Sequence, residues 1–293
     1  MQFWQTIEER IAAATGRPFR AEARRSVGGG CINETWVLEG GGRRWFVKLN
    51  MARRASMFEA ESEGLLALRE PQAIRVPEPV CHGIAGERSF LVLEYVDMGG
   101  PAAPARLGEQ LAVLHRHAAD RFGWHRDNTI GSTPQRNDWA DDWVRFWRER
   151  RLRVQIDLAA RNRASSGLID AGERLMAVLP AFFTDYRPAP SVLHGDLWGG
   201  NMDYDRAGNP VIFDPAVYFG DRETDIAMTE LFGGPGPAFQ DAYRANWPLD
   251  AGYALRRDLY NLYHVLNHYN LFGGGYGGQA ERMALGLLAG VGG

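Results

Sequence analysis

The sequence predicts an α+β fold with two lobes, a small β-rich lobe at the N-terminus and a larger, mainly helical lobe at the C-terminus. Three observations predict this bilobal division. Extended stretches punctuated by glycine occupy residues 24–49, a linker rich in Gly, Pro and Ala occupies residues 97–105, and long helical patterns follow it. We therefore place the lobes at residues 1–96 and 97–293. With 293 residues, 45% of them hydrophobic, the chain is long enough for both lobes to enclose a core.

The elements of the first lobe follow from local patterns. Phe3, Ile7 and Ile11 recur with the period of an amphipathic helix. Glycine clusters bound two short strands that form a hairpin, and a β-branched and aromatic run marks a further buried strand. In chain order, we expect a helix at 3–14, a glycine-rich bend at 28–30, a hairpin within 24–49 that turns at 40–42, a helix at 57–69 and a strand at 90–96.

The second lobe reads as helical except for one polar segment. That segment, residues 191–216, is predicted to form two short strands that flank a loop. Trp139, Trp143 and Trp147 recur at helical spacing, which favours a buried stripe over a binding face. The predicted helical stretches lie at 105–118, 137–160, 172–183 and through most of the C-terminal third.

Composition and charge narrow the classes of function. A formal net charge of −3 offers no excess of cations to follow a nucleic-acid backbone. No window approaches the roughly 18 to 20 uninterrupted apolar residues that a membrane span needs, and the N-terminus lacks the pattern of a signal peptide. With only Cys31 and Cys81, the sequence indicates neither a disulfide framework nor a cysteine metal site. We therefore predict a cytoplasmic protein that binds neither nucleic acid nor membrane.

The strongest chemical signal is the loop from His194 to Asn201, followed by Asp214 at the end of a β-branched run. Asp and Asn often only cap turns. An Asp with an Asn five residues later and a second Asp beyond a hairpin is, however, the arrangement found in kinases. There, one carboxylate orients the attacking hydroxyl, and the later Asn and Asp hold Mg²⁺. We therefore predict ATP-dependent phosphoryl transfer with Asp196 as the catalytic residue and Asn201 and Asp214 as Mg²⁺ ligands.

The first lobe is expected to hold the nucleotide. Gly28, Gly29 and Gly30 permit close approach of backbone amides to phosphates, although a glycine triplet alone is typical of a plain turn. Lys48 lies inside an apolar strand one hairpin later, in the order expected for a lysine that binds the α- and β-phosphates. Glu61 shares a helical face with Leu65 and Leu68 and is the expected carboxylate partner of that lysine, whereas a shift in helix phase would favour Glu63.

Residues 90–96 end the first lobe where a kinase places its adenine hinge. Recognition there uses backbone groups, so we assign it to Glu94 and Val96, with Leu93 at the back of the adenine pocket. The alternative, an ordinary buried strand, is compatible with the same residues.

These motifs resemble those of the fructosamine/ketosamine kinase family, relatives of the aminoglycoside phosphotransferases and choline kinases with a protein-kinase-like fold. The resemblance implies phosphorylation of the sugar 3-hydroxyl of a ketosamine, which leads to deglycation of a small molecule or a protein amine. It also implies that Trp198 lies over the sugar and that His268 helps to shape the acceptor pocket. The matching strings are GGGCIN, FVK with MFEAE, LEYVDM, LGEQLAVLH, PQRNDWADDWVRFWRERR, LHGDLWGGN, DPAVYFGDRETDIAM, LFGG and LNHYNLFGG.

Two other functions are alternatives to a ketosamine kinase. An aminoglycoside- or choline-type phosphotransferase would share the fold, but a pocket for a polycationic aminoglycoside should be acidic. Residues 135–153 are instead rich in arginine, much of it expected on a solvated helix face. A pseudokinase that only binds its partners would have lost a required residue, and none is missing. The sugar, whether derived from ribulose, erythrulose or fructose, and the oligomeric state stay open.

Cys31 suggests a redox hypothesis because it lies in the predicted phosphate-binding loop, where nearby amides would stabilise a thiolate. The alternative is a small side chain that merely fits the loop. If Cys31 is the sensor, Cys31→Ser abolishes the inhibition of activity by peroxide. Unchanged peroxide sensitivity would rule the hypothesis out.

Overall fold

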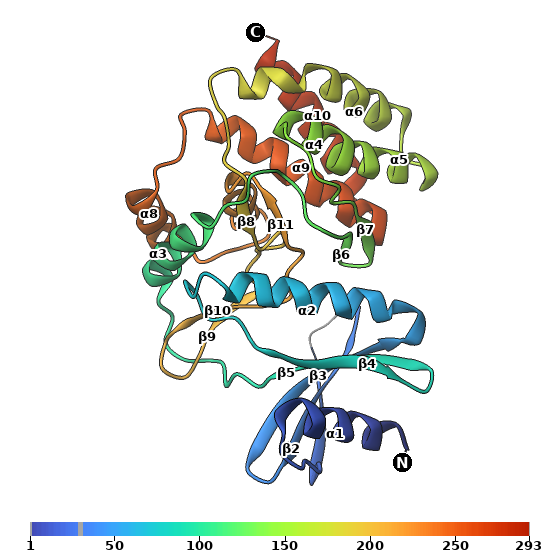
Figure 1. Cartoon of the computed structure of the whole chain (residues 1–293). Coiled ribbons are helices and arrows are strands. Elements are labelled where there is room, and N and C mark those ends of the chain that lie inside the picture. Colours follow the sequence, from blue (N-terminus) through green and yellow to red (C-terminus); the bar gives the residue numbers. More distant parts are fainter. Residues whose placement is uncertain (1, 29–31, 293) are drawn as a thin grey trace. The chain divides into compact units, whose positions relative to one another are not determined.

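The structure is a computed structural model that describes residues 2–28 and 32–292. By the contacts among its residues, the chain divides into two compact units. Unit 1 contains residues 1–103 and 203–215, and unit 2 contains residues 104–202 and 216–293. Unit 1 is β-rich and unit 2 mainly helical, which confirms the predicted fold class (Figure 1). The lobe limits predicted at residues 96 and 97 follow chain order alone and stay a prediction.

Unit 1 is built on a five-stranded antiparallel sheet with the order β1-β2-β3-β5-β4. The predicted hairpin is β2 and β3, whose turn needs glycine because Gly41 and Gly42 have φ angles of +56° and +70°. Two strands of this sheet were not predicted as separate elements. One is β1, which precedes the predicted hairpin, and the other is β4, whose segment is bounded by prolines; Pro79 is accommodated at the start of an edge strand. The strands are β1 (Ala23–Val27), β2 (Glu34–Gly40), β3 (Arg43–Met51), β4 (Pro79–Ala85) and β5 (Arg88–Glu94).

Two helices cover opposite faces of this sheet, α1 (Gln2–Thr15) and α2 (Ala55–Arg69), and a short 3₁₀ turn, η1 (Ala52–Arg54), precedes α2 (Figure 1). Ile7 and Ile11 of α1 pack in one core cluster with Val47 and Leu49 of β3. Because side chains alternate along a strand, Lys48 is turned to the opposite face, the one that α2 covers. Strand alternation therefore decides which side chain of β3 meets the helix.

A hairpin far along the chain completes unit 1. It consists of β9 (Met202–Tyr204) and β10 (Pro210–Ile212). The Ile212 amide donates to the Arg75 carbonyl at 3.1 Å, and the Gly99 amide donates to the Tyr204 carbonyl at 3.0 Å. Arg75 also pairs with Asp205 at 2.6 Å. These bonds fix the segment that carries Asp214 to the N-terminal part of the chain.

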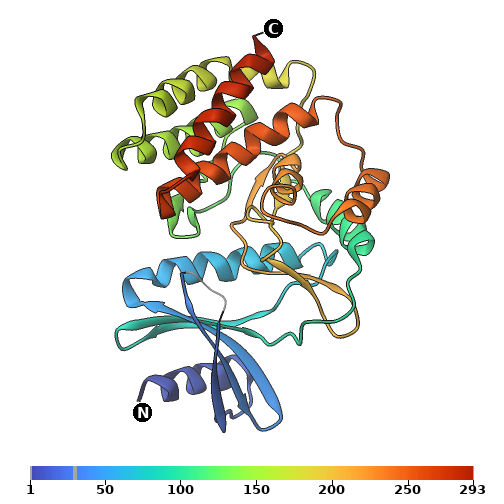
Figure 2. The same cartoon turned by 180° about the vertical axis from the view of Figure 1, so that it is seen from behind.

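In unit 2, α9 packs against α5, α7 and α10, while α3 packs against α8, and Figure 2 shows α10 lying beside α9 and α6. Trp143 and Trp147 are buried in this core, as the helical stripe predicted, whereas Trp139 is 38% exposed. The helices are α3 (Pro104–His115), α4 (Trp143–Phe146), a π-helical turn η2 (Trp147–Leu152), α5 (Arg153–Arg161), α6 (Ser166–Val178), a 3₁₀ turn η3 (Leu179–Phe183), α7 (Glu223–Met228), α8 (Pro237–Asn246), α9 (Tyr253–Phe272) and α10 (Tyr276–Val291). The strands form two antiparallel pairs, β6 (Asn128–Ile130) with β7 (Thr133–Gln135) and β8 (Ser191–Leu193) with β11 (Tyr218–Gly220).

The arginines of residues 135–153 only partly form the solvated face expected from the sequence. Arg145 is exposed, but Arg151 is fully buried, with its guanidinium 4.0 Å from the centre of the Tyr218 ring. Arg151 also donates to the Asn137 side chain at 2.9 Å. The basic character of this block therefore serves partly as internal packing.

Among the helices of residues 2–28 and 32–292, none has the length and hydropathy needed to cross a bilayer.

Two helical glycines in unit 2 provide a matched test of the packing. A Cβ added at Gly108 of α3 would lie 2.4 Å from the Phe239 carbonyl oxygen of α8, whereas a Cβ at Gly286 of α10 would meet no atom within 4 Å. We expect Gly108→Ala to lower the free energy of unfolding by about 1–3 kcal/mol through overpacking. Gly286→Ala should raise it by about 0.5–1 kcal/mol because alanine favours the helix. Urea unfolding measures both, and a Gly108→Ala variant as stable as the wild type would contradict the α3–α8 packing.

Candidate active site

Lys48 is the centre of the predicted nucleotide site, and its carboxylate partners Glu61 and Asp214 lie with it in unit 1. Lys48 is 3% exposed on β3, where it pairs in register with Thr35 and Leu91. Its ammonium donates to the Glu61 carboxylate of α2 at 2.5 Å and also to the Asp214 carboxylate. Three segments far apart in the sequence thus meet at one buried cation.

Electrostatics keep this lysine charged. Burial alone would lower the pKa of Lys48, but the carboxylates of Asp214 and Glu61 outweigh it and raise the pKa above its ordinary value. The pair of anions is needed because an ammonium group with so little contact with water loses most of its hydration. Lys48 is therefore a fixed positive charge.

Asp214 follows β10 and has an unusual backbone. Its φ angle is +58°, in the left-handed region that Asp enters more readily than most residues. Its side chain is 46% exposed while one oxygen accepts from Lys48. This conformation turns an acidic side chain toward the lysine directly after a buried strand. The sequence placed Asp214 correctly after a β-branched run but carried no sign of its backbone conformation.

The other residues predicted for the nucleotide lie in unit 1 with mixed outcomes. Gly28 is exposed, and a Cβ there would meet nothing within 4 Å; Gly29, Gly30 and Cys31 lie outside the described residues. Leu93 is 2% exposed, and Val96 is 7% exposed. The Glu94 amide donates to the Glu78 carbonyl at 2.8 Å, and the Glu94 carboxylate pairs with Arg75. The Glu94 amide and carboxylate are therefore both engaged within unit 1.

The second predicted set, Asp196 and Asn201, lies in unit 2 in the loop after β8. The Asn201 side-chain amide donates to the Asp196 carbonyl at 2.9 Å and to the Asp196 carboxylate at 3.2 Å. Gly195 has a φ angle of +81°, and a Cβ there would lie 2.1 Å from the Ala216 carbonyl oxygen. The loop therefore requires glycine directly before Asp196.

Asp225 of α7 fixes the backbone of this loop, and its role was not predicted from the sequence. Its two carboxylate oxygens accept from the backbone amides of His194 at 2.7 Å and Gly195 at 2.9 Å. His115 Nε2 lies 3.2 Å from the same carboxylate, and His115 Nδ1 lies 2.8 Å from the Tyr243 hydroxyl. The available signal for Asp225 was its position in a short helix, α7, whose residues are all buried. Its partners are too distant in sequence to be inferred from spacing.

The charge of Asp225 is stabilised despite its complete burial. Burial by itself would raise its pKa, but the hydrogen bond from His115 and the bonds from the loop amides lower the pKa below the ordinary 3.8. Because the pKa is lower in the folded state than in the unfolded chain, this contribution to stability is present above pH 3.8. It is lost as the pH falls through the folded-state pKa.

Trp198 and His268, the two residues implied for the acceptor, also lie in unit 2. Trp198 is 38% exposed, and a Cβ at Gly200 would come within 2.3 Å of its ring, so Gly200 permits its orientation. The His268 ring centre lies 4.4 Å from that of Phe232 and 5.2 Å from that of Tyr276. Burial lowers the pKa of His268, so its imidazole is neutral at pH 7.

Removing the Asp225 carboxylate should destabilise the fold. In Asp225→Ala, two buried amides and His115 lose their acceptor, and we expect the free energy of unfolding at pH 7 to fall by about 3 kcal/mol or more. The deficit should shrink as the pH is lowered below 3.8, where the wild type loses the same charge. Asp258→Ala is the control, since Asp258 is half-exposed and bonded to Arg257; it should change the stability by less than about 0.5 kcal/mol. Equal losses in both variants in chemical denaturation would contradict the assignment.

Comparison with known proteins gives one consistent family. The family model for "Fructosamine kinase" matches residues 3–289. A protein of Synechocystis sp. named "Probable ketoamine kinase" is 48% identical over 283 residues, which cover 96% of this chain and 95% of that protein. The chloroplastic protein-ribulosamine 3-kinase of Arabidopsis thaliana is 44% identical over 259 residues, which cover 87% of this chain and 79% of that protein.

Solved structures agree on the fold. A candidate fructosamine-3-kinase of Haemophilus somnus superposes with a TM-score of 0.89 at 28% identity, covering 98% of each chain. An aminoglycoside phosphotransferase superposes with a TM-score of 0.60 at 15% identity, covering 99% of each chain, and this likeness concerns the fold alone.

Proposed function

This chain belongs to the fructosamine kinase family, and on that premise we propose that it transfers the γ-phosphoryl group of ATP to the sugar 3-hydroxyl of a ketosamine. The family and the kinase activity expected from the motifs are confirmed by the match over residues 3–289. Within the ketosamines, ribulosamines are the substrates we favour, because two plant relatives at 44% and 40% identity are protein-ribulosamine 3-kinases by name. The amine belongs to a small molecule or to a glycated protein.

The observation that carries the proposal is the buried Lys48 between Glu61 and Asp214. A lysine at a strand edge would be solvated, whereas Lys48 is 3% exposed and held by two carboxylates. A fixed cation of this kind is what the phosphates of ATP require. We assign Lys48 to the α- and β-phosphates and Glu61 to its orientation. Gly28, Gly29 and Gly30 are proposed to cover the phosphates, and Leu93, Glu94 and Val96 to bind the adenine.

Asp196 is the residue proposed to act on the substrate hydroxyl. A carboxylate within hydrogen-bonding distance of that hydroxyl would orient it and accept its proton as the oxygen attacks phosphorus. Asn201 donates to this carboxylate and to the backbone of the same residue, so it restricts the rotation of Asp196. Asp225 fixes the two amides just before Asp196. The geometry of the base is therefore determined by side chains that do not touch the substrate.

Mg²⁺ fits the donor types of Asn201 and Asp214. Both offer hard oxygen ligands, and because the Asn201 nitrogen donates to Asp196, we assign the ion to the Asn201 amide oxygen. No group of three or more His, Cys, Asp or Glu side chains among the described residues could hold a metal ion. Such a group is not required, because substrate phosphates and water complete the shell of Mg²⁺ in kinases. When bound, Mg²⁺ would neutralise negative charge on the phosphates.

Trp198 and His268 are proposed to recognise the sugar. The exposed indole of Trp198, two residues after Asp196, offers a flat apolar surface for a sugar ring. His268 Nδ1 donates to the His264 carbonyl at 2.8 Å, so the neutral imidazole can accept a hydrogen bond from a sugar hydroxyl at Nε2. An aminoglycoside acceptor is less well supported, because the relatives that cover most of the chain are ketoamine and ribulosamine kinases by name.

We also propose a cytoplasmic location, which follows from the two cysteines and is compatible with the buried thiol of Cys81. Burial raises the pKa of Cys81 to about 12, so it stays protonated and unreactive. The net charge of −3 gives no support for a nucleic-acid partner.

A substrate panel tests the proposed function. We expect incubation with Mg-ATP to add one phosphate to ribulosamines and, more slowly, to fructosamines, and none to aminoglycosides or choline, as read by mass spectrometry. Asp196→Asn should lower the rate by about a thousandfold or more, because it removes the base without changing the size of the side chain. Phosphorylation of an aminoglycoside or choline instead would replace the proposed acceptor. ATP turnover equal to background in both proteins would reject an enzymatic role.

The proposed role of Glu61 has a matched control on the same helix. Glu61→Gln removes one carboxylate from Lys48, and we expect kcat/KM for ATP to fall about 10- to 100-fold, the range of a hydrogen bond to a charged group. Glu59→Gln changes the same type of side chain at an exposed position of α2 and should leave kcat/KM within about twofold. Steady-state kinetics with varied ATP decides, and equal effects at both positions would remove Glu61 from the site.

A further inference from the structure

A second cavity in unit 2 contains none of the residues assigned to the reaction. It has a volume of about 510 Å³ and is lined by residues of α4 and η2, by η3 and by the loop that leads from η3 to β8. Asp196, Asn201, Trp198 and His268 are not among its lining residues. Its size is that of a site for a small organic molecule.

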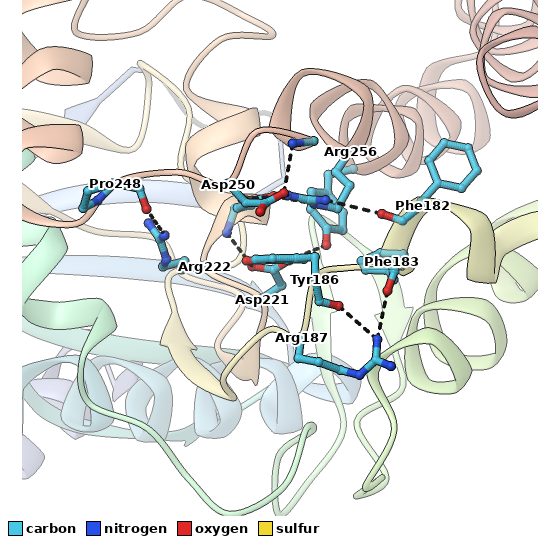
Figure 3. Close-up of polar contacts among 12 residues, drawn as sticks. Phe182, Phe183, Tyr186, Arg187, Asp221, Arg222, Pro248, Asp250 and Arg256 are labelled. Carbon is cyan, nitrogen blue, oxygen red and sulfur yellow. Dashed lines mark hydrogen bonds and ion pairs between the residues drawn. The ribbon is translucent and has the colours of Figure 1, made fainter.

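Two arginines of this cavity are anchored but not neutralised. Arg148 donates through Nε to the Met176 carbonyl at 2.9 Å, and Arg187 donates through Nη1 to the Phe183 carbonyl at 2.9 Å and to the Tyr186 carbonyl at 3.3 Å. Figure 3 shows the last two bonds, with the Arg187 guanidinium close to Phe183 and away from Asp221. Within the described part of the chain, neither guanidinium forms an ion pair with a carboxylate. Each therefore keeps donors for an external oxyanion in a restrained position.

Both acidic residues of the cavity have hydrogen-bond partners, and Asp142 keeps its charge because its partner is a backbone amide. Asp141 pairs with Arg121 at 2.6 Å, and Asp142 accepts from the Arg145 amide at 2.6 Å as the cap of α4. The third arginine, Arg145, meets the Glu149 carboxylate at 3.3 Å on the helix surface. Arg148 and Arg187 are thus the cations left for a ligand. Two such charges match a phosphate monoester, which carries nearly two negative charges at pH 7.

The remaining wall suits an organic body rather than a bare ion. Phe122, Phe183 and Val144 line the cavity together with Pro180 and Pro188. Rigid apolar side chains of this kind favour a flat or compact apolar group next to the charged one. Inorganic phosphate has no apolar group, so these apolar side chains would stay exposed to water when it binds.

Hydrogen bonds connect two lining residues of the cavity to the buried carboxylate of Asp221. Tyr186 lines the cavity, and its hydroxyl donates to Asp221 at 2.9 Å, as Figure 3 shows. Trp143, another lining residue, donates to the Tyr260 hydroxyl at 3.0 Å, and Tyr260 donates to the other oxygen of Asp221 at 2.6 Å. The Tyr186 ring also lies 3.8 Å from the guanidinium carbon of Arg256. Both aromatic side chains are held in place by this network, so the cavity is pre-formed.

We propose that this cavity is a binding site for a small organic phosphate monoester, with Arg148 and Arg187 holding the phosphate and the aromatic and proline wall holding the organic group. The site is separate from the catalytic loop in its residues. A ligand bound there would take no part in the proposed phosphoryl transfer.

Phenyl phosphate is the probe for this site. The full-length protein is titrated by isothermal calorimetry in the presence of saturating Mg-ADP, which keeps the probe out of the nucleotide site. We expect one molecule to bind per chain, and Arg148→Gln and Arg187→Gln to weaken binding about tenfold or more each. Thr184→Trp, which fills the cavity from an exposed lining position and removes no charge, should abolish binding. It also keeps the test valid if an arginine variant fails to fold.

Arg174→Gln is the matched control, because Arg174 is an exposed arginine of α6 outside the cavity and its loss changes the net charge equally. Its affinity should equal that of the wild type. Absence of saturable binding would overturn the proposal. So would binding that survives both Thr184→Trp and the arginine variants, since the probe would then lie elsewhere. Equal affinity for inorganic phosphate would overturn the part played by the apolar wall. None of these results depends on kinase turnover, so they are distinguishable from a failure of the proposed function.

Discussion

Lys48 is almost completely removed from water, and an ammonium group in that position needs carboxylates close to it. The rest of unit 1 supplies them. Alternation along β3 turns the lysine toward α2, where Glu61 lies, and the β9–β10 hairpin brings Asp214 from the other end of the unit. A fold that lost any one of these three elements would leave an uncompensated charge, so the pairing links the sheet, the helix and the late hairpin.

Unit 2 also buries a charged group that needs partners close to it, but here the charge is negative. The buried carboxylate of Asp225 is compensated by two backbone amides and by His115 rather than by a lysine or arginine. This choice has a structural consequence, because the amides belong to the residues directly before Asp196. The charge that must be satisfied for the unit to fold therefore also determines the conformation of the loop proposed to carry the base. Arg256 and Glu223 form a further buried pair at 2.8 Å at the start of the same helix.

Much of this arrangement could be predicted because it is encoded locally. The position of Lys48 in an apolar strand, the helical spacing that selects Glu61 and the five-residue separation of Asp196 and Asn201 all appear in short stretches of sequence. Partners that depend on tertiary structure could not be found this way. Asp225 lies 30 residues from Gly195, whose amide donates to it, and no periodicity connects the two. Gly29, Gly30 and Cys31 lie outside the described residues, so their proposed roles stay predictions.

The arginines of residues 135–153 show most clearly where local patterns fail. In the sequence they form one basic helical block, yet Arg145 is exposed, Arg148 is anchored beside a cavity and Arg151 is fully buried against Tyr218. Which of these environments an arginine occupies depends on the π-helical turn and on residues from other helices. A helix whose phase changes within one turn does not present the face that a regular period predicts.

The position of the transferred phosphate tests the account most directly. A ribulosamine labelled in the sugar, treated with Mg-ATP and the protein, is followed by ³¹P and ¹³C NMR, with Asp196→Asn in parallel. The account predicts a single phosphate monoester on the 3-hydroxyl, formed by the wild type and not by the variant. Phosphate on another hydroxyl, or equal product from the variant, would contradict the assignment of Asp196 to that hydroxyl.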